Sequence, residues 1–302
     1  MSAVSTRPAA LRANAFEPDA ADAYRNWRAR KLAAYPKGTS ALMVPVADPR
    51  ALTDAEKAAL VDRCRRANMA VYVSAATGED SDIPRCLGRQ LGLERLDRNY
   101  LADDDGVSSV TVAGAAGRGE FIPYTNRPIR WHTDGYYNAP DRNIRAMLLH
   151  CVRRAREGGA NTLLDHEIAY LRLRDENPEW IRALMLPDAM TIPAREDEAG
   201  IARPTQTGPV FSVDRHDGVL HMRYTARTKS IEWKRDPVVA AAVAALARLL
   251  DEDSPWHHHL VLEPGMGIVC NNVLHERTGF SDDPEAPRLL YRARYYERVE
   301  GT

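Results

Sequence analysis

Apolar runs bounded by turn residues predict strands in both halves of the chain. Residues 69–75 (MAVYVSA), 107–114 (VSSVTVAG) and 160–166 (ANTLLDH) have the length and composition of strands. Residues 144–155 (IRAMLLHCVRRA) fit a strand or a helix by periodicity alone. Their position directly after the polar motif at 132–134 favours a strand.

Helical periodicity occurs in the first third of the chain and again between residues 167 and 253. Residues 52–68 begin with Thr53 or Asp54 as a cap, and a second short helix ends at Gly92. Residues 167–184 have a helical pattern in which Pro178 opens a second helix, and residues 237–253 form an Ala-rich helix. Residues 208–225 predict a hairpin that turns at Asp217-Gly218, and strand-like segments follow at 258–280 and 287–299.

Strands, then a helix-rich insert, then more strands make an α+β organisation, compatible with a sandwich that the insert covers at one end. We expect residues 1–40 to be a lead-in that is partly helical or disordered. Residues 41–302 then form one domain, with the helical insert at about 166–255.

Composition restricts the classes of function. The 302 residues contain 41 basic and 42 acidic side chains, so neither nucleic acid nor a membrane surface is an expected partner. No run approaches the roughly 18 apolar residues of a membrane span. The four cysteines form no C-x-x-C pair, which favours a reducing cytoplasm over a disulfide framework or a thiolate zinc site. The pattern does not determine whether the chain forms a homo-oligomer.

The segment RWHTDGYYNAPD, residues 130–141, carries the first candidate chemistry. On a strand, His132 and Asp134 would point to the same face, as two metal ligands or as a hydrogen-bonded surface pair. A facial triad of two histidines and one carboxylate binds iron(II) and leaves three positions open, and His275 could supply the missing histidine. His257, His258 and His259 look like a metal cluster, but consecutive strand residues point to opposite faces. His150, in an apolar run, is interpreted as a core residue.

Four ordered motifs, WHTDGYY, GGANTLLD, NNVLHERTGF and RLLYRARY, resemble the taurine dioxygenase (TauD/TfdA) superfamily of Fe(II)- and 2-oxoglutarate-dependent oxygenases. The segments around the first two are especially similar to the gamma-butyrobetaine hydroxylase branch. The resemblance runs from the helix near residue 54 to the end of the chain. It implies a double-stranded β-helix (jelly roll) with a helical insert, and Fe(II), 2-oxoglutarate and dioxygen as cofactor and co-substrates.

Matched position by position, the resemblance implies a role for each polar residue of these motifs. His132, Asp134 and His275 would bind iron. Thr162 would hydrogen-bond the distal carboxylate of 2-oxoglutarate, and Arg288 would pair with it in bidentate fashion. Two further arginines would assist: Arg277 as a supporting residue behind the ligands, and Arg292 as a contact to an anionic substrate or the co-substrate. Solvated arginines on an ordinary strand are the alternative for the RARY segment.

The substrate pocket is less defined by the sequence. Aromatic and polar residues around the ligand motif and the hairpin are candidates to contact substrate, namely Tyr124, Asn126, Tyr136, Tyr137 and Arg223. Aromatic rings hold quaternary ammonium groups through cation–π attraction, but they equally build hydrophobic cores. We therefore expect a small polar metabolite such as a betaine, an amino acid or a sulfonate.

The resemblance implies an enzyme that oxidises an unactivated C–H bond, releasing succinate and CO2. Hydroxylation is favoured over halogenation because related halogenases lack the carboxylate that Asp134 supplies here. Two alternatives remain: a non-catalytic sensor that binds metal or 2-oxoglutarate on the same fold, and a zinc-dependent hydrolase, which the 2-oxoglutarate anchors disfavour.

Overall fold

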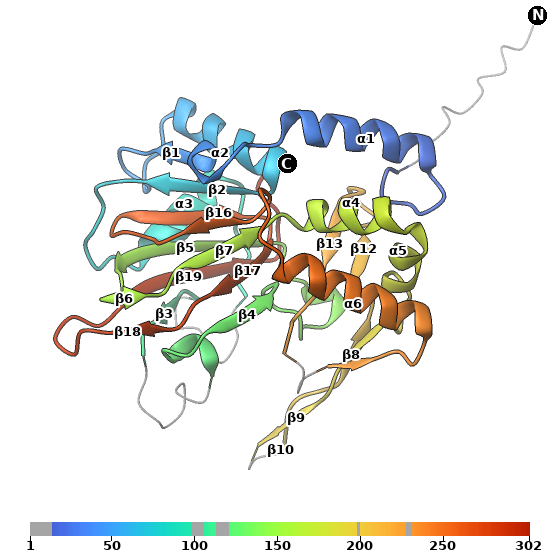
Figure 1. Ribbon diagram of the computed structural model, residues 1–302. Helices are drawn as coiled ribbons and strands as arrows, with labels where there is room; N and C mark the ends of the chain where they lie inside the picture. The colour runs from blue at the N-terminus through green and yellow to red at the C-terminus, as the bar shows by residue number, and fades with distance from the viewer. Residues whose placement is uncertain (1–13, 98–105, 113–120, 198–199, 228–230) are drawn as a thin grey trace, which may run out of the picture.

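Two antiparallel-rich sheets stacked face to face form the centre of the molecule, with helices on the outer side and at one end (Figure 1). The computed structural model describes residues 14–97, 106–112, 121–197, 200–227 and 231–302. The expected strand at 107–114 therefore lies only partly within the described residues. The expected helical or disordered lead-in falls in part on residues 1–13, outside the described residues.

The larger sheet has six strands in the order β1-β2-β16-β5-β19-β3. All its neighbouring pairs are antiparallel except β1 with β2. Its strands are β1 (Met43–Pro45), β2 (Met69–Val73), β3 (Ser108–Val110), β5 (Ala146–Arg153), β16 (Met266–Cys270) and β19 (Leu289–Tyr295). Residues 144–155, ambiguous by periodicity, thus contain the central strand β5. Both faces of β5 are covered, which explains its continuous apolar run.

The smaller sheet has four strands in the order β15-β7-β17-β4. They are β4 (Ile129–His132), β7 (Asn161–Leu164), β15 (His258–Leu260) and β17 (Leu274–Arg277). Beside it, β6 (Glu157–Gly158) pairs with β18 (Phe280–Ser281). Two facing sheets of this kind, with strands contributed alternately from distant parts of the chain, form the double-stranded β-helix that the motifs implied.

Helices cover the outer face and one end of the sheets (Figure 1). They are α1 (Ala21–Ala34), α2 (Asp54–Ala67), α3 (Asp82–Gln90), α4 (His166–Glu176), α5 (Pro178–Leu184) and α6 (Pro237–Asp251). Helix α2 begins with a full capping box between Thr53 and Glu56, and α5 begins at Pro178 with Asn177 as its cap. The helix predictions for these segments are confirmed.

Between β7 and β15 the chain forms α4 to α6 and small β elements beside them. These are β8 (Met190–Ile192), β9 (Arg195–Asp197), β10 (Gly200–Arg203), β11 (Gln206–Gly208), β12 (Phe211–Val213), β13 (Leu220–Met222) and β14 (Glu232–Trp233). The expected hairpin at 208–225 is present as the antiparallel pair β12–β13. Short 3-10 helices complete the described elements: η1 (Thr39–Leu42), η3 (Ile122–Tyr124) and η4 (Pro140–Arg142).

The packing of β16 between β2 and β5 leaves no room for a side chain at Gly267. A Cβ atom there would overlap the carbonyl oxygen of Leu149 and the ring of Tyr72. We expect Gly267→Ala to lower the free energy of unfolding by about 1–3 kcal/mol, because the methyl group overpacks the core. Urea denaturation would measure the change.

Gly78 offers a matched control, since its Cβ position has no neighbouring atom within 4 Å. Gly78→Ala should change the unfolding free energy by less than about 0.5 kcal/mol. Equal stability of the two variants would show that β16 is not packed as described.

Candidate active site

The pairing of β17 with β4 brings together two histidines that are far apart in the sequence. His275 stands directly opposite His132 in the antiparallel ladder, and the centroids of their rings are 4.2 Å apart. Strand β17 also pairs with β7 on its other side, so His275 is held from both edges. The long-range prediction that residue 275 returns to the 132–134 motif is met by the geometry.

Asp134 joins the two histidines from a turn and not from a strand. Strand β4 ends at His132, and Asp134 follows in the turn that contains Gly135. The strand argument for a shared face is therefore wrong for Asp134: the turn, not strand alternation, aims its carboxylate. Asp134 Oδ1 lies 3.7 Å from His132 Nε2, and one ligand atom from each of the three residues lies within 4.8 Å of the others.

The hydrogen bonds of the two imidazoles define which nitrogen faces the site. His132 Nδ1 lies 2.9 Å from the carbonyl oxygen of Arg130, and His275 Nδ1 lies 3.0 Å from that of Val273. Because a carbonyl oxygen can only accept, each Nδ1 carries the proton and each Nε2 keeps its lone pair. A neutral imidazole oriented in this way is the form that binds a metal.

The charge state of the three groups also suits a metal ion. Burial lowers the pKa of His132 to about 3 and lowers that of His275, so both rings are neutral near pH 7. Burial alone would raise the pKa of Asp134, but the guanidinium groups of Arg292 and Arg294 outweigh it and hold this pKa well below its usual range. Asp134 is therefore an anion although it is only 6% exposed.

An unsatisfied carboxylate atom indicates that the cluster fits a metal. Asp134 Oδ2 is buried and has no hydrogen-bond partner among the described residues. An unpartnered carboxylate oxygen is costly in a protein interior unless something compensates for its charge. Two Nε2 lone pairs and this oxygen form a donor set of two histidines and one carboxylate, which suits a non-haem ferrous ion.

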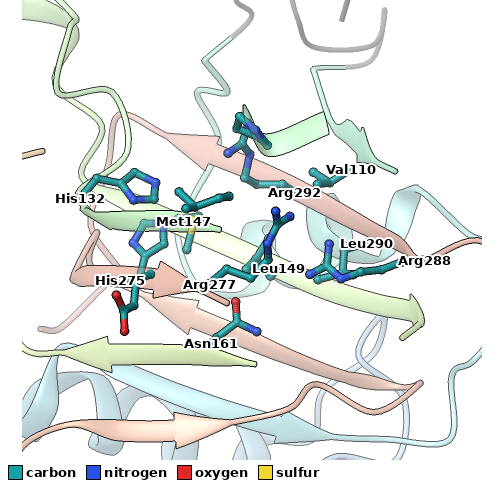
Figure 2. A pocket seen from close by; sticks show the side chains of 13 residues that line it. Val110, His132, Met147, Leu149, Asn161, His275, Arg277, Arg288, Leu290 and Arg292 are labelled. Atoms are coloured by element: carbon teal, nitrogen blue, oxygen red, sulfur yellow. The ribbon is translucent and has the colours of Figure 1, made fainter. Parts of the chain in front are cut away.

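A pocket extends from the two histidines along the space between the sheets (Figure 2). His132 and His275 lie at one end, and Arg277 and Arg288 lie towards the other. Its apolar walls include Met147, Leu149 and Leu290 from the six-stranded sheet and Ile129 from the four-stranded sheet. The pocket therefore combines a metal-binding end, a cationic end and apolar sides.

The cationic end lacks an anionic counterpart among the described residues that line it, apart from Glu276, whose side chain faces Thr162. Arg277 and Arg288 are 4% and 5% exposed and both lie over the ring of Phe280. Burial, with Arg288 beside it, lowers the pKa of Arg277 to about 9. Two buried guanidinium groups that repel one another are suited to bind an anion between them.

Arg277 is also fixed to the segment that precedes β4. Its Nη2 donates to the carbonyl oxygens of Thr125 and Arg127, whereas its Nε and Nη1 have no partner among the described residues. Arg277 thus ties β17 to the start of the ligand strand and leaves two donors available. Arg277, expected from the sequence to support the metal ligands from behind, also lines the pocket itself.

The structure places Asn161 in the pocket, whereas the sequence pointed to Thr162. Leu163 is opposite His275 in the ladder, so alternate residues of β7 put Asn161 on the face of His275 and Thr162 on the other face. Asn161 lines the pocket, and its Nδ2 is buried without a partner among the described residues. Thr162 Oγ1 instead lies 3.2 Å from Nδ1 of His259. The sequence pattern could not distinguish Asn161 from Thr162, because the choice depends on the register of β7 against β17.

Arg292 lines the pocket between its two ends, and its Nη1 lies 3.6 Å from Asp134 Oδ1. Arg294, two residues later on β19, is buried as well. It pairs with Asp97 at 2.6 Å and donates to Tyr137 Oη at 3.0 Å. The RARY segment is thus a buried strand with partnered arginines, so the alternative of solvated arginines is wrong.

The residues proposed from sequence to contact substrate do not gather in the pocket. Arg223 donates to the main-chain carbonyls of Met190 and Gly208, so it joins β8 to β11 as a structural residue. Tyr124 is buried at 1% exposure, and Asn126 is exposed to solvent. Local sequence could not separate these roles, because each depends on packing between distant segments.

Tyr136 and Tyr137 lie half-buried just beyond the Asp134 turn. Their rings pack edge to face, with centroids 5.1 Å apart. The guanidinium carbon of Arg203 lies 5.2 Å from the centroid of the Tyr137 ring. An aromatic pair with a guanidinium beside it can stack on a planar ring and attract an anion. Among the substrate-contact residues expected from the sequence, these two tyrosines lie near the metal ligands.

The other histidines considered in the sequence lie outside the group of His132, Asp134 and His275. His258 is fully buried, whereas His259 is exposed, and no group of three metal-binding side chains includes either of them in the described part of the chain. His150 is a packed residue whose Nδ1 lies 2.9 Å from Tyr72 Oη. Cys64, Cys86, Cys151 and Cys270 are all free thiols.

A double-stranded β-helix that holds two histidines and one carboxylate at one end of a pocket between its sheets defines the class of non-haem iron oxygenases. Residues 30–294 match the family model described as "Taurine catabolism dioxygenase TauD, TfdA family". The chain belongs to this family, and with it to the Fe(II)- and 2-oxoglutarate-dependent dioxygenases.

Two curated relatives are named uridine-5'-phosphate dioxygenase. The one from Amycolatopsis sp. is 35% identical over 179 residues, which cover 55% of this chain and 60% of that protein. The one from Streptomyces sp. is 32% identical over 203 residues, which cover 63% and 69% respectively. The superfamily prediction is confirmed, but these names do not confirm the gamma-butyrobetaine hydroxylase branch or a betaine-like substrate.

Solved structures agree on the fold. An asparagine oxygenase in complex with Fe(II), 3-hydroxyasparagine and succinate has a TM-score of 0.58 at 15% identity, covering 80% of this chain and 78% of that one. The non-heme iron oxygenase OrfP in complex with Fe and alpha-ketoglutaric acid has a TM-score of 0.57 at 18% identity, covering 81% and 80%. In the described part of this chain, no helix is both long and apolar enough to cross a membrane.

Proposed function

We propose that this protein is a dioxygenase of a nucleoside 5'-phosphate, with uridine 5'-phosphate as the first candidate. It uses iron held by His132, Asp134 and His275. The observation that carries the metal assignment is the convergence of these three buried ligand atoms within 4.8 Å, with one carboxylate oxygen left unpartnered. Bound ferrous iron and 2-oxoglutarate would together activate dioxygen, the oxidant of the reaction, which amino-acid side chains cannot do.

The pocket residues divide the remaining tasks. Arg277, Arg288 and Asn161 bind the distal carboxylate of 2-oxoglutarate. All three line the pocket, and Arg277 and Asn161 each have a buried donor without a partner among the described residues. Met147, Leu149 and Leu290 keep water away from the space between the two ends. Thr162, assigned to this carboxylate from the sequence, is replaced in this role by Asn161.

The substrate proposal rests on the relatives' names and on the residues beyond Asp134. A uracil ring could stack on Tyr136 and Tyr137, and Arg203 beside Tyr137 offers a cation to a phosphate group. The chain spans 60% and 69% of the length of the two named relatives, and the shared activity is proposed on that partial match. A cytoplasmic location remains a prediction.

Removal of one metal ligand tests the iron assignment. We expect His132→Ala to weaken Fe(II) binding by at least about 100-fold, measured by anaerobic titration, because an imidazole ligand is lost. His259→Ala is the matched control, since His259 is exposed and contacts Thr162. It should bind iron as the unmodified protein does, and equal affinities for all three proteins would refute the assignment.

Neighbouring residues on opposite faces of β7 test the co-substrate site. Asn161→Ala should weaken 2-oxoglutarate binding by about 10–100-fold, as expected for one hydrogen bond to a charged group. Thr162→Ala should leave the affinity for 2-oxoglutarate unchanged. Arg288→Ala should lower this affinity more than Asn161→Ala does. Calorimetric titration of the iron-loaded protein measures all three. The reverse order for Asn161 and Thr162 would restore the assignment made from the sequence.

Succinate formation tests the substrate. The iron-loaded protein with 2-oxoglutarate and ascorbate should release succinate faster when uridine 5'-phosphate is added than with uridine, taurine, a betaine or an amino acid. The phosphate would pair with the guanidinium of Arg203 beside Tyr137. Stimulation by a betaine or a sulfonate alone would reject the nucleotide. Tight 2-oxoglutarate binding without turnover on any of these compounds would favour a sensor.

A further inference from the structure

The turn between β16 and β17 carries two adjacent asparagines, Asn271 and Asn272, that are 3% and 2% exposed. Asn272 has a left-handed backbone with φ of 52°, a conformation that asparagine tolerates better than most residues. The turn lies three residues before His275. It therefore belongs to the segment that delivers the second histidine to the metal site.

The side chain of Asn272 binds both main-chain polar groups of Asp134. Its Oδ1 accepts from the Asp134 amide at 2.8 Å, and its Nδ2 donates to the Asp134 carbonyl at 2.9 Å. The second Nδ2 hydrogen goes to the carbonyl of Ile144 at 2.7 Å. One buried side chain thus holds the residue on both sides of its Cα atom, and all its donors are used.

Asp134 needs such a contact because no strand ladder holds it. Strand β4 ends at His132, and Thr133 is the last residue before Asp134 with a main-chain bond to the neighbouring segment, to the Tyr224 carbonyl at 3.0 Å. The next residue, Gly135, has φ of 67° and no room for a Cβ atom beside Ile144. The direction of the Asp134 carboxylate therefore depends on contacts from other segments.

Asn271 fixes the same turn from the other side. Its Nδ2 donates to Asn68 Oδ1 at 3.1 Å and to Thr302 Oγ1 at 2.9 Å, and its Oδ1 accepts from the amide of Val299 at 3.1 Å. The turn is thus tied to the end of α2 and to residues 299–302. A turn anchored in this way gives Asn272 a fixed base from which to hold Asp134.

We infer that Asn272 is a positioning residue for the carboxylate ligand: through its amide it sets the place of Asp134 relative to His275. The inference rests on the proposed iron site. It adds a second link between the two ligand segments, independent of the β4–β17 ladder. Iron affinity therefore depends on a side chain that does not touch the metal.

Asn272→Gly removes the side chain and keeps a residue that accepts a positive φ. In the metal-free protein, the Asp134 amide should exchange its hydrogen about tenfold faster, because it loses a buried acceptor. Fe(II) affinity should fall by about 10–100-fold. Hydrogen exchange resolved at residue 134 and anaerobic iron titration measure the two effects separately.

Asn68→Gly is the matched control. Asn68 also has a positive φ, 57°, and its side chain belongs to the same buried network, but it makes no contact with Asp134. It should lower thermal stability as Asn272→Gly does and leave both iron affinity and the Asp134 amide unchanged. The turn stays anchored in this variant, because the bond from the Asn271 amide to the Asn68 carbonyl at 2.8 Å and the side-chain bonds of Asn271 to residues 299 and 302 remain. Asn272→Asp keeps an acceptor for the Asp134 amide, so this amide should still exchange slowly in that variant. Asn272→Asp provides the test if the glycine variant does not fold.

Unchanged iron affinity in Asn272→Gly, or an equal loss in Asn68→Gly, would overturn the inference. Fast exchange of the Asp134 amide in Asn272→Asp would also overturn it. A failure of the proposed function looks different, because the unmodified protein itself would then fail to bind Fe(II).

Discussion

The antiparallel pairing of β17 with β4 is the constraint on which the site depends. It places His275 opposite His132, and the pairing of β17 with β7 on its other edge sets which residues of β7 face the pocket. A shift of one residue in this register would turn His275 to the other face. It would also exchange Asn161 for Thr162 in the pocket. The two histidine ligands and Asn161 therefore depend on the register of one strand, β17, with its two neighbours.

The pocket contains buried charges of opposite sign at two separate places, and neither is fully compensated by the described residues. Asp134 has Arg292 and Arg294 nearby, yet one of its oxygens remains unpartnered among the described residues. At the far end, Arg277 and Arg288 repel one another. A divalent cation at the first place and a carboxylate at the second would relieve both penalties. A doubly charged keto acid that reaches from the metal to the arginines therefore matches the separation of charge along the pocket.

Much of this arrangement could be predicted from local patterns. Helix α2 follows from its capping box, and the metal set follows from motifs in which His132, Asp134 and His275 appear in order. What failed required knowledge of distant partners. Asn161 or Thr162 could be chosen only with the register of β7 against β17. Arg223 resembled a ligand until its carbonyl partners on β8 and β11 were placed. The contact of Asn272 with Asp134 could not be predicted, because the two residues are 138 positions apart in the chain.

Each ligand imidazole is oriented by a main-chain carbonyl two positions before it, at residues 130 and 273. Every amino acid contributes the same carbonyl group, so substitutions at these positions leave the tautomer of the ligand intact. No second carboxylate has to be retained for this purpose, unlike in sites where an acidic side chain orients the histidine. The surrounding walls can consequently diverge during evolution to accept new substrates while the coordination chemistry stays the same.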